Sequence, residues 1–319
     1  MDQNFDIVCL GDATIDIFLP LSESNSLNNF SFDSGEKYLA DGYRLFTGGI
    51  ASNVAVGLSK LNKKVAIIAE IGTDILSDKI VQNFEEDGVY TKLLKRNPAR
   101  TPTLSAVISN KGRHILFTAH INSEHEFSFE NVKSSWLLLA SLGDKWKNAY
   151  QDALSYALAN NTKIAFAPGG NQLREGKDSL TGFIAKTDII FLNKEEAQSL
   201  AGESDDVKSL LEQIKKLGAK TVVITDGLDG SYCIDENSNV YHAGIVQTDT
   251  KETTGAGDAY TSGFLAAFIS GETVENAMKW GALNSASVVQ KVGAQEGLLT
   301  RDKLEEEVKK LENFEIKII

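Results

Sequence analysis

The sequence predicts an α/β fold in which helices cover a mostly parallel central sheet. Two observations lead to this prediction. Short apolar runs alternate along the chain with longer runs of helical period, which is the pattern of βαβ units. Several apolar runs are nearly continuous in Val, Ile, Leu, Ala and Phe, which is typical of strands buried on both faces. The chain of 319 residues is 42% hydrophobic and 24% charged, which is ordinary for a globular protein.

Six apolar runs are expected to form strands, and eight amphipathic or apolar runs are expected to form helices. The strands are Phe5–Leu10, Val65–Ile71, Ser135–Ala140, Lys163–Ala167, Asp188–Leu192 and Thr221–Thr225. The helices between them are Ala51–Leu61, Asp74–Asp87, Lys147–Ala159, Lys194–Ala201 and Ser204–Leu217, and those near the C-terminus are Ala256–Ile269, Thr273–Val289 and Arg301–Leu311.

Two segments interrupt this alternation. Asp12–Phe46 has no long helical period and is rich in Ser, Asn, Asp and Gly. Arg100–Asn122 contains two strand-like runs, Thr103–Ser109 and Arg113–Ala119, joined at Asn110-Lys111-Gly112, which indicates a hairpin. We therefore expect residues 1–319 to form one domain, with a small β-sheet lid inserted at about residues 12–46 and 100–122. Simple loop excursions are the alternative.

The composition excludes several classes of protein. The net charge is −12, whereas nucleic acids and anionic membranes are bound by basic surfaces, so neither is expected as a partner. Cys9 and Cys233 are too few for a disulfide framework, which favours a reducing compartment. The first residues show no signal-peptide pattern, and no apolar run is long enough to span a membrane. The expected location is the cytoplasm.

The segment from Glu252 to Asp258 (ETTGAGD) precedes an apolar helix and carries the main chemical signal. Two glycines separated by an alanine can expose backbone N–H groups at a helix start, where the helix dipole also favours negative charge. Such a site binds a phosphoryl group without a lysine. A carboxylate beside these N–H groups stays ionised and can accept a proton from an alcohol. The simpler alternative is that Asp258 only caps the helix.

Two common nucleotide-binding motifs are absent from the sequence. No G-x-x-x-x-G-K-[ST] segment occurs, so a P-loop is not indicated. Tyr260 stands where the third glycine of G-x-G-x-x-G would be, which disfavours a dinucleotide-binding dehydrogenase.

Four spaced motifs resemble those of the ribokinase-like sugar kinases, the PfkB carbohydrate kinase family. They are the segment Glu252–Asp258, the run Gly48-Gly49-Ile50-Ala51-Ser52-Asn53, the N-x-x-E segment Asn193–Glu196, and the turn Thr225-Asp226-Gly227 followed by Gly230. The resemblance covers essentially the whole chain in the family's order. It implies a ribokinase-like three-layer α/β/α domain with a small β-sheet lid, and an ATP-dependent kinase with a hydroxyl acceptor.

The resemblance also implies roles for the phosphoryl-transfer residues. Asp258 is expected to be the general base, and the backbone of Gly255, Ala256 and Gly257 is expected to form the anion hole. Glu196 is expected to contribute to a Mg²⁺ site through water, with Asn193 beside it. A capping box formed by the same pair is compatible with that role.

Further residues are expected to bind the two substrates. Thr225 and Gly227 follow a buried strand, at the edge where ligands of α/β sheets bind, and by resemblance they contact the nucleotide together with Gly230. Asn284 is expected to approach the adenine. On the acceptor side, the expected residues are Asp12, Asp16, Gly48, Gly49 and Asn53. Asp12 and Asp16 would share a face if the segment is extended, and carboxylates suit sugar hydroxyls.

One position departs from the family pattern. Glu252 stands where the family often has Asp, so a K⁺ site formed with Thr254 and with carbonyl groups near Gly293 is in doubt. The histidines, His114, His120, His125 and His242, lack metal-ligand spacing and are expected at the surface or in the lid.

The acceptor is not fixed by the motifs. A sugar phosphate would need basic residues such as Arg100 or Arg113 beside the sugar, whereas Tyr43, Phe46 and Phe117 could stack on a nucleoside base. A neutral sugar or sugar acid is preferred, with a nucleoside as the alternative. A catalytically silent ligand-binding relative is the alternative of another class. Exposed lid strands also make pairing into a homodimer plausible.

Overall fold

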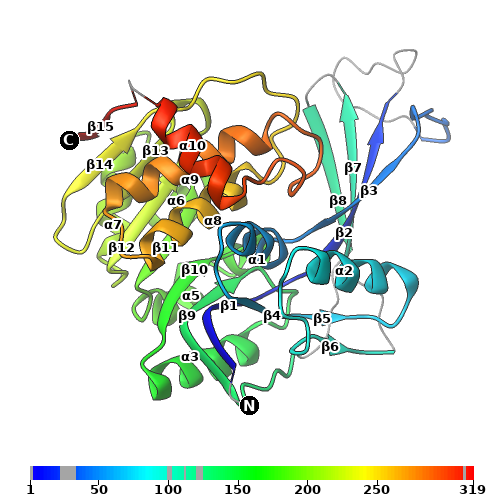
Figure 1. The fold of residues 1–319 in the computed structure, drawn as a ribbon, viewed down its shortest axis with the longest axis horizontal. Coiled ribbons are helices and arrows are strands. Elements are labelled where there is room, and N and C mark those ends of the chain that lie inside the picture. The colour runs from blue at the N-terminus through cyan, green and yellow to red at the C-terminus, as the bar shows by residue number, and fades with distance from the viewer. Residues whose placement is uncertain (1–2, 22–33, 99–102, 111–112, 120–124, 312–313) are drawn as a thin grey trace.

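A nine-stranded sheet forms the centre of the molecule (Figure 1). The computed structural model describes residues 3–21, 34–98, 103–110, 113–119, 125–311 and 314–319. The sheet has the strand order β15-β14-β13-β12-β11-β10-β9-β1-β4. The six strands β12, β11, β10, β9, β1 and β4 are parallel to one another, and β13, β14 and β15 add an antiparallel edge beside β12. The prediction of a mostly parallel sheet is therefore confirmed.

The strands of this sheet have the following bounds. They are β1 Gln3–Leu10, β4 Val65–Ile68, β9 Val132–Ala140, β10 Lys163–Ala167, β11 Ile189–Asn193, β12 Thr221–Thr225, β13 Ser231–Ile234, β14 Val240–Ala243 and β15 Ile316–Ile318. Two further short strands, β5 Glu70–Ile71 and β6 Lys95–Arg96, pair with each other.

Two hydrophobic cores lie on the two faces of the sheet, because alternate side chains of each strand point to opposite sides. In β1, Ile7 and Cys9 belong to one core, and Val8 and Leu10 belong to the other. The first core contains residues of α1 Ile50–Lys60, α2 Ile75–Glu86, α8 Ala256–Ile269, α9 Val274–Val288 and α10 Arg301–Lys310. The second contains residues of α3 Lys147–Asn160, α5 Lys177–Ile184, α6 Lys194–Ala201 and α7 Val207–Lys215.

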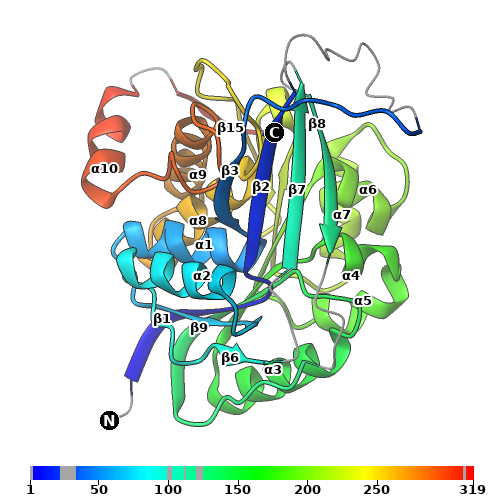
Figure 2. The same cartoon turned by 90° about the vertical axis from the view of Figure 1, so that its right-hand side faces the viewer.

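This arrangement is the three-layer α/β/α domain that the sequence predicted. Figure 2 shows the two helical layers on opposite sides of the large sheet. The described residues contain no helix that is long and apolar enough to cross a membrane.

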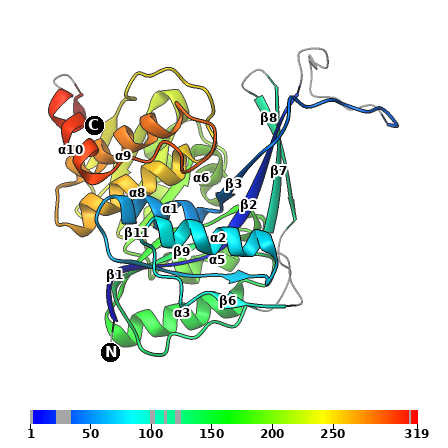
Figure 3. The same ribbon diagram turned by 45° about the vertical axis from the view of Figure 1, so that its right-hand side comes forward.

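A second sheet of four strands projects from the main domain (Figure 3). Its order is β3-β2-β7-β8, with β2 Thr14–Pro20, β3 Arg44–Gly48, β7 Thr103–Asn110 and β8 Arg113–Ala119. Strands β7 and β8 form the hairpin expected from the sequence. Arg100 lies outside the described residues, as do parts of the two predicted lid segments.

Several elements differ from the sequence-based expectations. The run Val65–Ile71 forms two strands rather than one, with Ala69 between them. The helix expected at Ser204–Leu217 begins only at Val207, because the Asp206 side chain accepts from Lys208 N and caps it there. The short helices α4 Gly170–Arg174 and α5 were not expected, and neither were β14 and β15.

The prediction that all four histidines lie at the surface or in the lid is wrong for His125. This side chain is 1% exposed, stacks on Phe127, and its Nδ1 lies 3.1 Å from Glu70 Oε2. The ring is therefore part of a buried polar pair. His242 is half-buried and stacks on Tyr232. His120 lies outside the described residues, as does the side chain of His114.

Candidate active site

A pocket opens at the carboxyl ends of strands β10, β11 and β12, where parallel sheets of this type bind ligands. We call it the Asp258 pocket, and its volume is about 170 Å³. Side chains at the ends of three strands meet the first turn of α8 there. Its lining residues are Ile50, Ala167, Pro168, Phe191, Leu192, Asn193, Glu196, Val223, Thr225, Thr253, Gly255, Ala256, Gly257, Asp258 and Thr261.

Helix α8 begins at the Asp258 pocket, and a glycine turn sets its start. Gly255 is the residue before the helix and has φ +82°, a left-handed conformation that glycine adopts without strain. A Cβ atom at this position would lie 2.4 Å from Ala294 Cβ, so the turn also needs glycine for space. The turn therefore presents the first N–H groups of α8 to the pocket.

Glu252 holds the preceding loop in place. Its Oε1 accepts hydrogen bonds from Thr253 N at 2.9 Å, from Thr254 N at 3.1 Å and from Thr254 Oγ1 at 3.0 Å. The side chain is buried, and these contacts give it a structural role without a cation. A monovalent cation at Glu252 stays a prediction.

The N–H groups of the predicted anion hole are not equivalent. Ala256 N donates to Thr253 O at 3.1 Å, so this amide is used within the turn. The amides of Gly255, Gly257 and Asp258 have no partner among the described residues. Because the helix dipole adds positive character at the same place, these three N–H groups are better suited to bind an anion than Ala256 N–H. Ala256 therefore contributes to the shape of the turn, and its N–H is not available to an anion in this structure.

Asp258 lies in the first turn of α8, and its carboxylate lines the pocket. Its Oδ2 accepts a hydrogen bond of 2.7 Å from Asn53 Nδ2 on α1. Burial raises the pKa of Asp258 to about 7, while the Asn53 bond lowers it and the charge of Asp16 raises it further. A carboxyl group with a pKa near the working pH is suited to general-base catalysis.

Asp16 on β2 lies close enough to Asp258 for its charge to affect that carboxyl group. Burial raises the pKa of Asp16 to about 6, against the hydrogen bonds from Thr14 and Ser105. A Cβ atom at Gly48 would lie 2.1 Å from Asp16 Oδ2, so Gly48 leaves room for this carboxylate. The structure thus brings Asp16, Asn53 and Asp258 close to one another.

Asp12 lies in the turn between β1 and β2, and Gly49, the residue before α1, packs against it. Gly49 has φ +93°, and a Cβ atom there would lie 2.4 Å from Asp12 O. Asp12 itself is 8% exposed and lies close enough to Tyr150 to raise the pKa of that phenol, an effect second to burial. The two aspartates predicted for one ligand therefore have different neighbours: Tyr150 for Asp12 and Asp258 for Asp16.

Glu196 faces Asp258 from the start of α6. Asn193 Oδ1 accepts from Glu196 N at 2.8 Å, and Glu196 Oε2 accepts from Asn193 N at 2.9 Å, which is a capping box. Burial raises the pKa of Glu196 to about 7, and the nearby Asp258 adds to this rise. A carboxylate that faces a pocket next to a second acidic group fits Mg²⁺, which needs few protein ligands because it keeps several waters.

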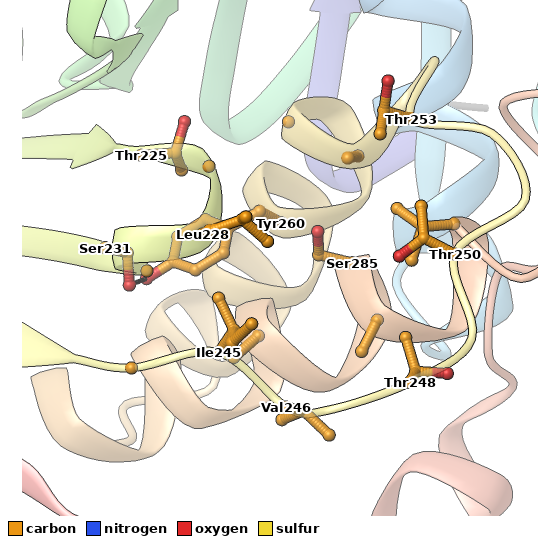
Figure 4. A pocket seen from close by; sticks show the side chains of 18 of the residues that line it. Thr225, Leu228, Ser231, Ile245, Val246, Thr248, Thr250, Thr253, Tyr260 and Ser285 are labelled. Atoms are coloured by element: carbon orange, nitrogen blue, oxygen red, sulfur yellow. Dashed lines mark hydrogen bonds between the residues drawn. The ribbon is translucent and has the colours of Figure 1, made fainter. Parts of the chain in front are cut away.

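A second pocket adjoins the Asp258 pocket and shares Thr225, Thr253, Ala256 and Gly257 with it. We call it the Leu228 pocket; its volume is about 340 Å³, and no charged side chain lines it (Figure 4). Its walls come from the turn after β12, from residues 244–250 and from helices α8 and α9. The labelled side chains include Leu228, Ile245, Val246, Thr248, Tyr260 and Ser285.

Gly227 and Gly230 shape the entrance of the Leu228 pocket. Gly230 has φ +87°, and a Cβ atom there would lie 2.1 Å from Ala243 O. Gly227 has φ +51° but faces open space. An uncharged, partly apolar pocket that leads to free helix N–H groups can hold a planar base with its phosphates on α8.

Asn284 does not line the Leu228 pocket, so the prediction that it approaches an adenine is wrong. Its side chain is fully buried between α8 and α9. Asn284 Nδ2 donates to Ala259 O and Ser262 Oγ, and its Oδ1 accepts from Leu299 N. Its amide therefore joins two helices and a loop.

The sequence missed the residues that form most of the Leu228 pocket. Residues 244–250 carry no motif, and their place beside α9 follows only from the tertiary structure. Gln295 was also missed, although it donates to Asn53 Oδ1 at 2.9 Å. Its position two residues after Gly293 was the only available signal.

Comparisons with known proteins identify relatives of this chain. Residues 4–301 match the family model described as pfkB family carbohydrate kinase. An ATP-dependent 6-phosphofructokinase of Thermoanaerobacterium thermosaccharolyticum is 24% identical over 308 residues, which are 92% of this chain and 90% of that protein.

Solved structures show the same fold. The nucleoside kinase of Methanocaldococcus jannaschii, an archaeal member of the ribokinase family, has a TM-score of 0.77 at 21% identity, with 97% of this chain and 99% of that chain covered. Arabidopsis thaliana ribokinase, complexed with ribose and ATP, has a TM-score of 0.81 at 18% identity, with 96% and 99% covered. The predicted ribokinase-like fold is confirmed.

Proposed function

The chain belongs to the pfkB family of carbohydrate kinases, and we propose that it transfers the γ-phosphoryl group of ATP to a hydroxyl group of a neutral sugar or sugar acid. It is a phosphotransferase with a hydroxyl acceptor, of the sugar and nucleoside kinase class. The observation that supports the finer proposal most strongly is the position of Asp258. Its carboxylate lines a pocket beside free helix N–H groups and has a pKa of about 7.

Asp258 is the general base of this proposal. It accepts the proton of the acceptor hydroxyl while the oxygen of that hydroxyl forms a bond to the γ-phosphorus. The bond between this phosphorus and the bridging oxygen breaks, and ADP leaves. The N–H groups of Gly255, Gly257 and Asp258 stabilise the negative charge on the transferred group. General-base catalysis is typically worth ~10²–10⁴-fold in rate.

The nucleotide is assigned to the Leu228 pocket. Its uncharged walls suit a neutral base, and the residues that it shares with the Asp258 pocket lead the phosphates to α8. Thr225 and Gly227 are in contact with the nucleotide in this arrangement, and Gly230 shapes the turn. Glu196 would hold Mg²⁺ through water, and the ion would neutralise charge on the phosphates when bound.

The acceptor is assigned to the space around Asp16, Asn53 and Asp258. Buried carboxylates accept hydrogen bonds from sugar hydroxyls, whereas a phosphorylated acceptor would need a positive charge beside them. A nearby lysine or arginine would lower the pKa of Asp16 or Asp258, and none of the described residues of these types has such an effect on either carboxyl group. This favours an acceptor without a phosphate.

A nucleoside is the alternative acceptor. Phe117 and Tyr43 are 56% and 69% exposed, so both could stack on a base. Phe46 packs edge-on against Phe18, with 5.3 Å between ring centroids, and is less available.

Three further proposals concern the small sheet and ions. The small sheet acts as a lid that closes on the acceptor and excludes water. Its outer strands, β3 and β8, can pair between two subunits. A monovalent cation near Glu252 would activate the enzyme. Solution scattering with and without substrates tests the closure of the lid. Sedimentation tests the pairing of subunits. Assays with K⁺, or with tetramethylammonium in its place, test activation by a monovalent cation.

The direct test of the function is turnover with MgATP and a panel of acceptors. The panel contains neutral sugars, sugar acids, sugar phosphates and nucleosides, and ADP release is measured together with the mass of the product. The proposal predicts a phosphorylated neutral sugar or sugar acid. A nucleoside product would favour the alternative acceptor, and a bisphosphorylated sugar would contradict the assignment of an acceptor without a phosphate. ATP binding without turnover of any acceptor would indicate a catalytically silent relative.

A further inference from the structure

A chain of hydrogen bonds connects the small sheet to Asp258, and Gln295 lies in its middle. We propose that Gln295 is a positioning residue that fixes the Asn53 amide with its NH₂ group toward Asp258, and that Thr47 of β3 ties this orientation to the small sheet. The inference rests on the proposed phosphoryl transfer and adds a residue that no motif indicates.

The chain runs through four side-chain contacts. Asn83 Nδ2 on α2 donates to Thr47 Oγ1 at 3.1 Å, and Thr47 Oγ1 donates to Gln295 Oε1 at 2.8 Å. Gln295 Nε2 donates to Asn53 Oδ1 at 2.9 Å, and Asn53 Nδ2 donates to Asp258 Oδ2 at 2.7 Å. The residues are far apart in the sequence, so the chain exists only in the folded protein.

The direction of these bonds is fixed by the donors. The Thr47 hydroxyl has one hydrogen, and while it accepts from Asn83 it gives this hydrogen to Gln295. The Gln295 NH₂ group uses its two hydrogens on Asn53 Oδ1 and on Ser52 Oγ, the latter at 3.1 Å. A rotated Asn53 amide would place NH₂ against NH₂ at Gln295 and a carbonyl against the carboxylate of Asp258. Gln295 therefore selects the orientation that donates to the base.

The segment Gly293–Gln295 packs against β3 and against the turn before α8. Gly293 has φ +102°, and a Cβ atom there would lie 2.7 Å from Phe46 Cδ1 on β3. Ala294 packs against Gly255, where an added Cβ would lie 2.4 Å away. Three consecutive residues thus contact the small sheet, the anion-binding turn and Asn53. Movement of β3 would be transmitted to the base through the same segment.

The groups around Asp258 set its pKa, and the loss of Gln295 should therefore change the pH dependence of the rate. Asp16 faces Asp258 from β2, Glu196 lies in the same pocket on α6, and Asn53 faces it from α1. Asn53 supplies the contact that lowers the pKa of Asp258, against burial and Asp16. If Asn53 is no longer held, the pKa of Asp258 rises and the base is protonated at neutral pH.

The test compares Gln295→Met, which removes the amide without adding charge, with Gln290→Met. Gln290 is exposed just after α9, at the start of the same loop, and its side-chain Nε2 donates to Ala286 O. For Gln295→Met, we expect kcat at pH 7 to fall about fivefold and the acidic limb of the pH–rate profile to move up by about one pH unit. The loss should shrink at pH 9, where Asp258 is ionised in both proteins, and KM for ATP should stay within about twofold. Gln290→Met should match the unaltered protein.

A second pair of variants tests the link to the small sheet. Thr47→Val removes the hydroxyl and should shift the pH–rate profile in the same direction, whereas Thr47→Ser keeps the hydroxyl and should restore it. An equal loss of kcat at every pH, or an unshifted profile in Gln295→Met, would overturn the proposal. The titration of Asp258, followed by carboxyl ¹³C NMR without substrates, gives the same comparison without turnover. A protein with no kinase activity would therefore refute the proposed function, while this titration would still decide the role of Gln295.

Discussion

Replacing Asp258 with asparagine is expected to make the folded protein more stable at neutral pH. Burial raises the pKa of Asp258 from its ordinary value of 3.8 to about 7, with Asn53 opposing the rise and Asp16 adding to it. Because the folded state binds this proton more tightly than the unfolded state, the free energy of unfolding falls as pH rises from 3.8 to about 7. Three pH units at about 1.36 kcal/mol each give about 4 kcal/mol at pH 8.

Denaturant unfolding at two pH values measures this effect. Asp258→Asn has no charge to desolvate, and its side-chain oxygen still accepts from Asn53. We expect Asp258→Asn to be more stable than the unaltered protein by up to about 4 kcal/mol at pH 8. At pH 5 the gain should be only about 1.5 kcal/mol, because pH 5 lies only about one unit above the pKa of the carboxyl in the unfolded state. Asp178→Asn, the same exchange in the exposed first turn of α5, is the control and should change stability by less than about 1 kcal/mol. An equal gain at both pH values would refute the reasoning.

Three further outcomes are expected from the site. The rate of phosphoryl transfer should fall below about pH 7 because Asp258 must be ionised, and a constant rate from pH 5 to 8 would contradict the assignment of the base. Gly230→Ala should raise KM for ATP and destabilise the fold more than Gly227→Ala, because only an alanine at position 230 collides with a backbone oxygen. Gly227→Ala should destabilise the fold by about 1–2 kcal/mol, the cost of a left-handed backbone at an alanine. Equal effects of the two variants in calorimetry and kinetics would argue against this account of the turn. Glu196→Gln should keep the capping box and raise the Mg²⁺ concentration needed for half-maximal rate, and an unchanged Mg²⁺ titration would remove Glu196 from the metal site.

The main sheet could be predicted because its strands carry their own signal. The run Thr221–Thr225 in β12 is β-branched throughout and buried along most of its length, so it is recognised as a strand without any tertiary information. The antiparallel edge strands β14 and β15 lack this signal, because Val240–Ala243 is short and Ile316–Ile318 is largely exposed. The helix α4 has five residues, too few for a helical period to be recognised.

The residues of the site also fall into those that a local motif predicts and those whose place only the tertiary structure shows. Asp258, Asn53 and Glu196 were predicted because each lies in a short motif, and the structure brings them together around one pocket or one hydrogen bond. Asn284 was assigned wrongly, because an amide on an apolar helix has the same local pattern whether it faces a pocket or joins two helices. Gln295 was missed, because its contact with Asn53 joins residues 242 positions apart in the sequence.

The central claim is that Asp258 removes the proton from the acceptor hydroxyl. It is tested most directly by the rate of phosphoryl transfer by Asp258→Asn at pH 8, with the acceptor found in the panel and with ATP affinity measured in parallel. The account predicts that the rate falls by about 10²–10⁴-fold while ATP binds within about threefold of the unaltered protein. A rate within about tenfold of that of the unaltered protein would contradict it.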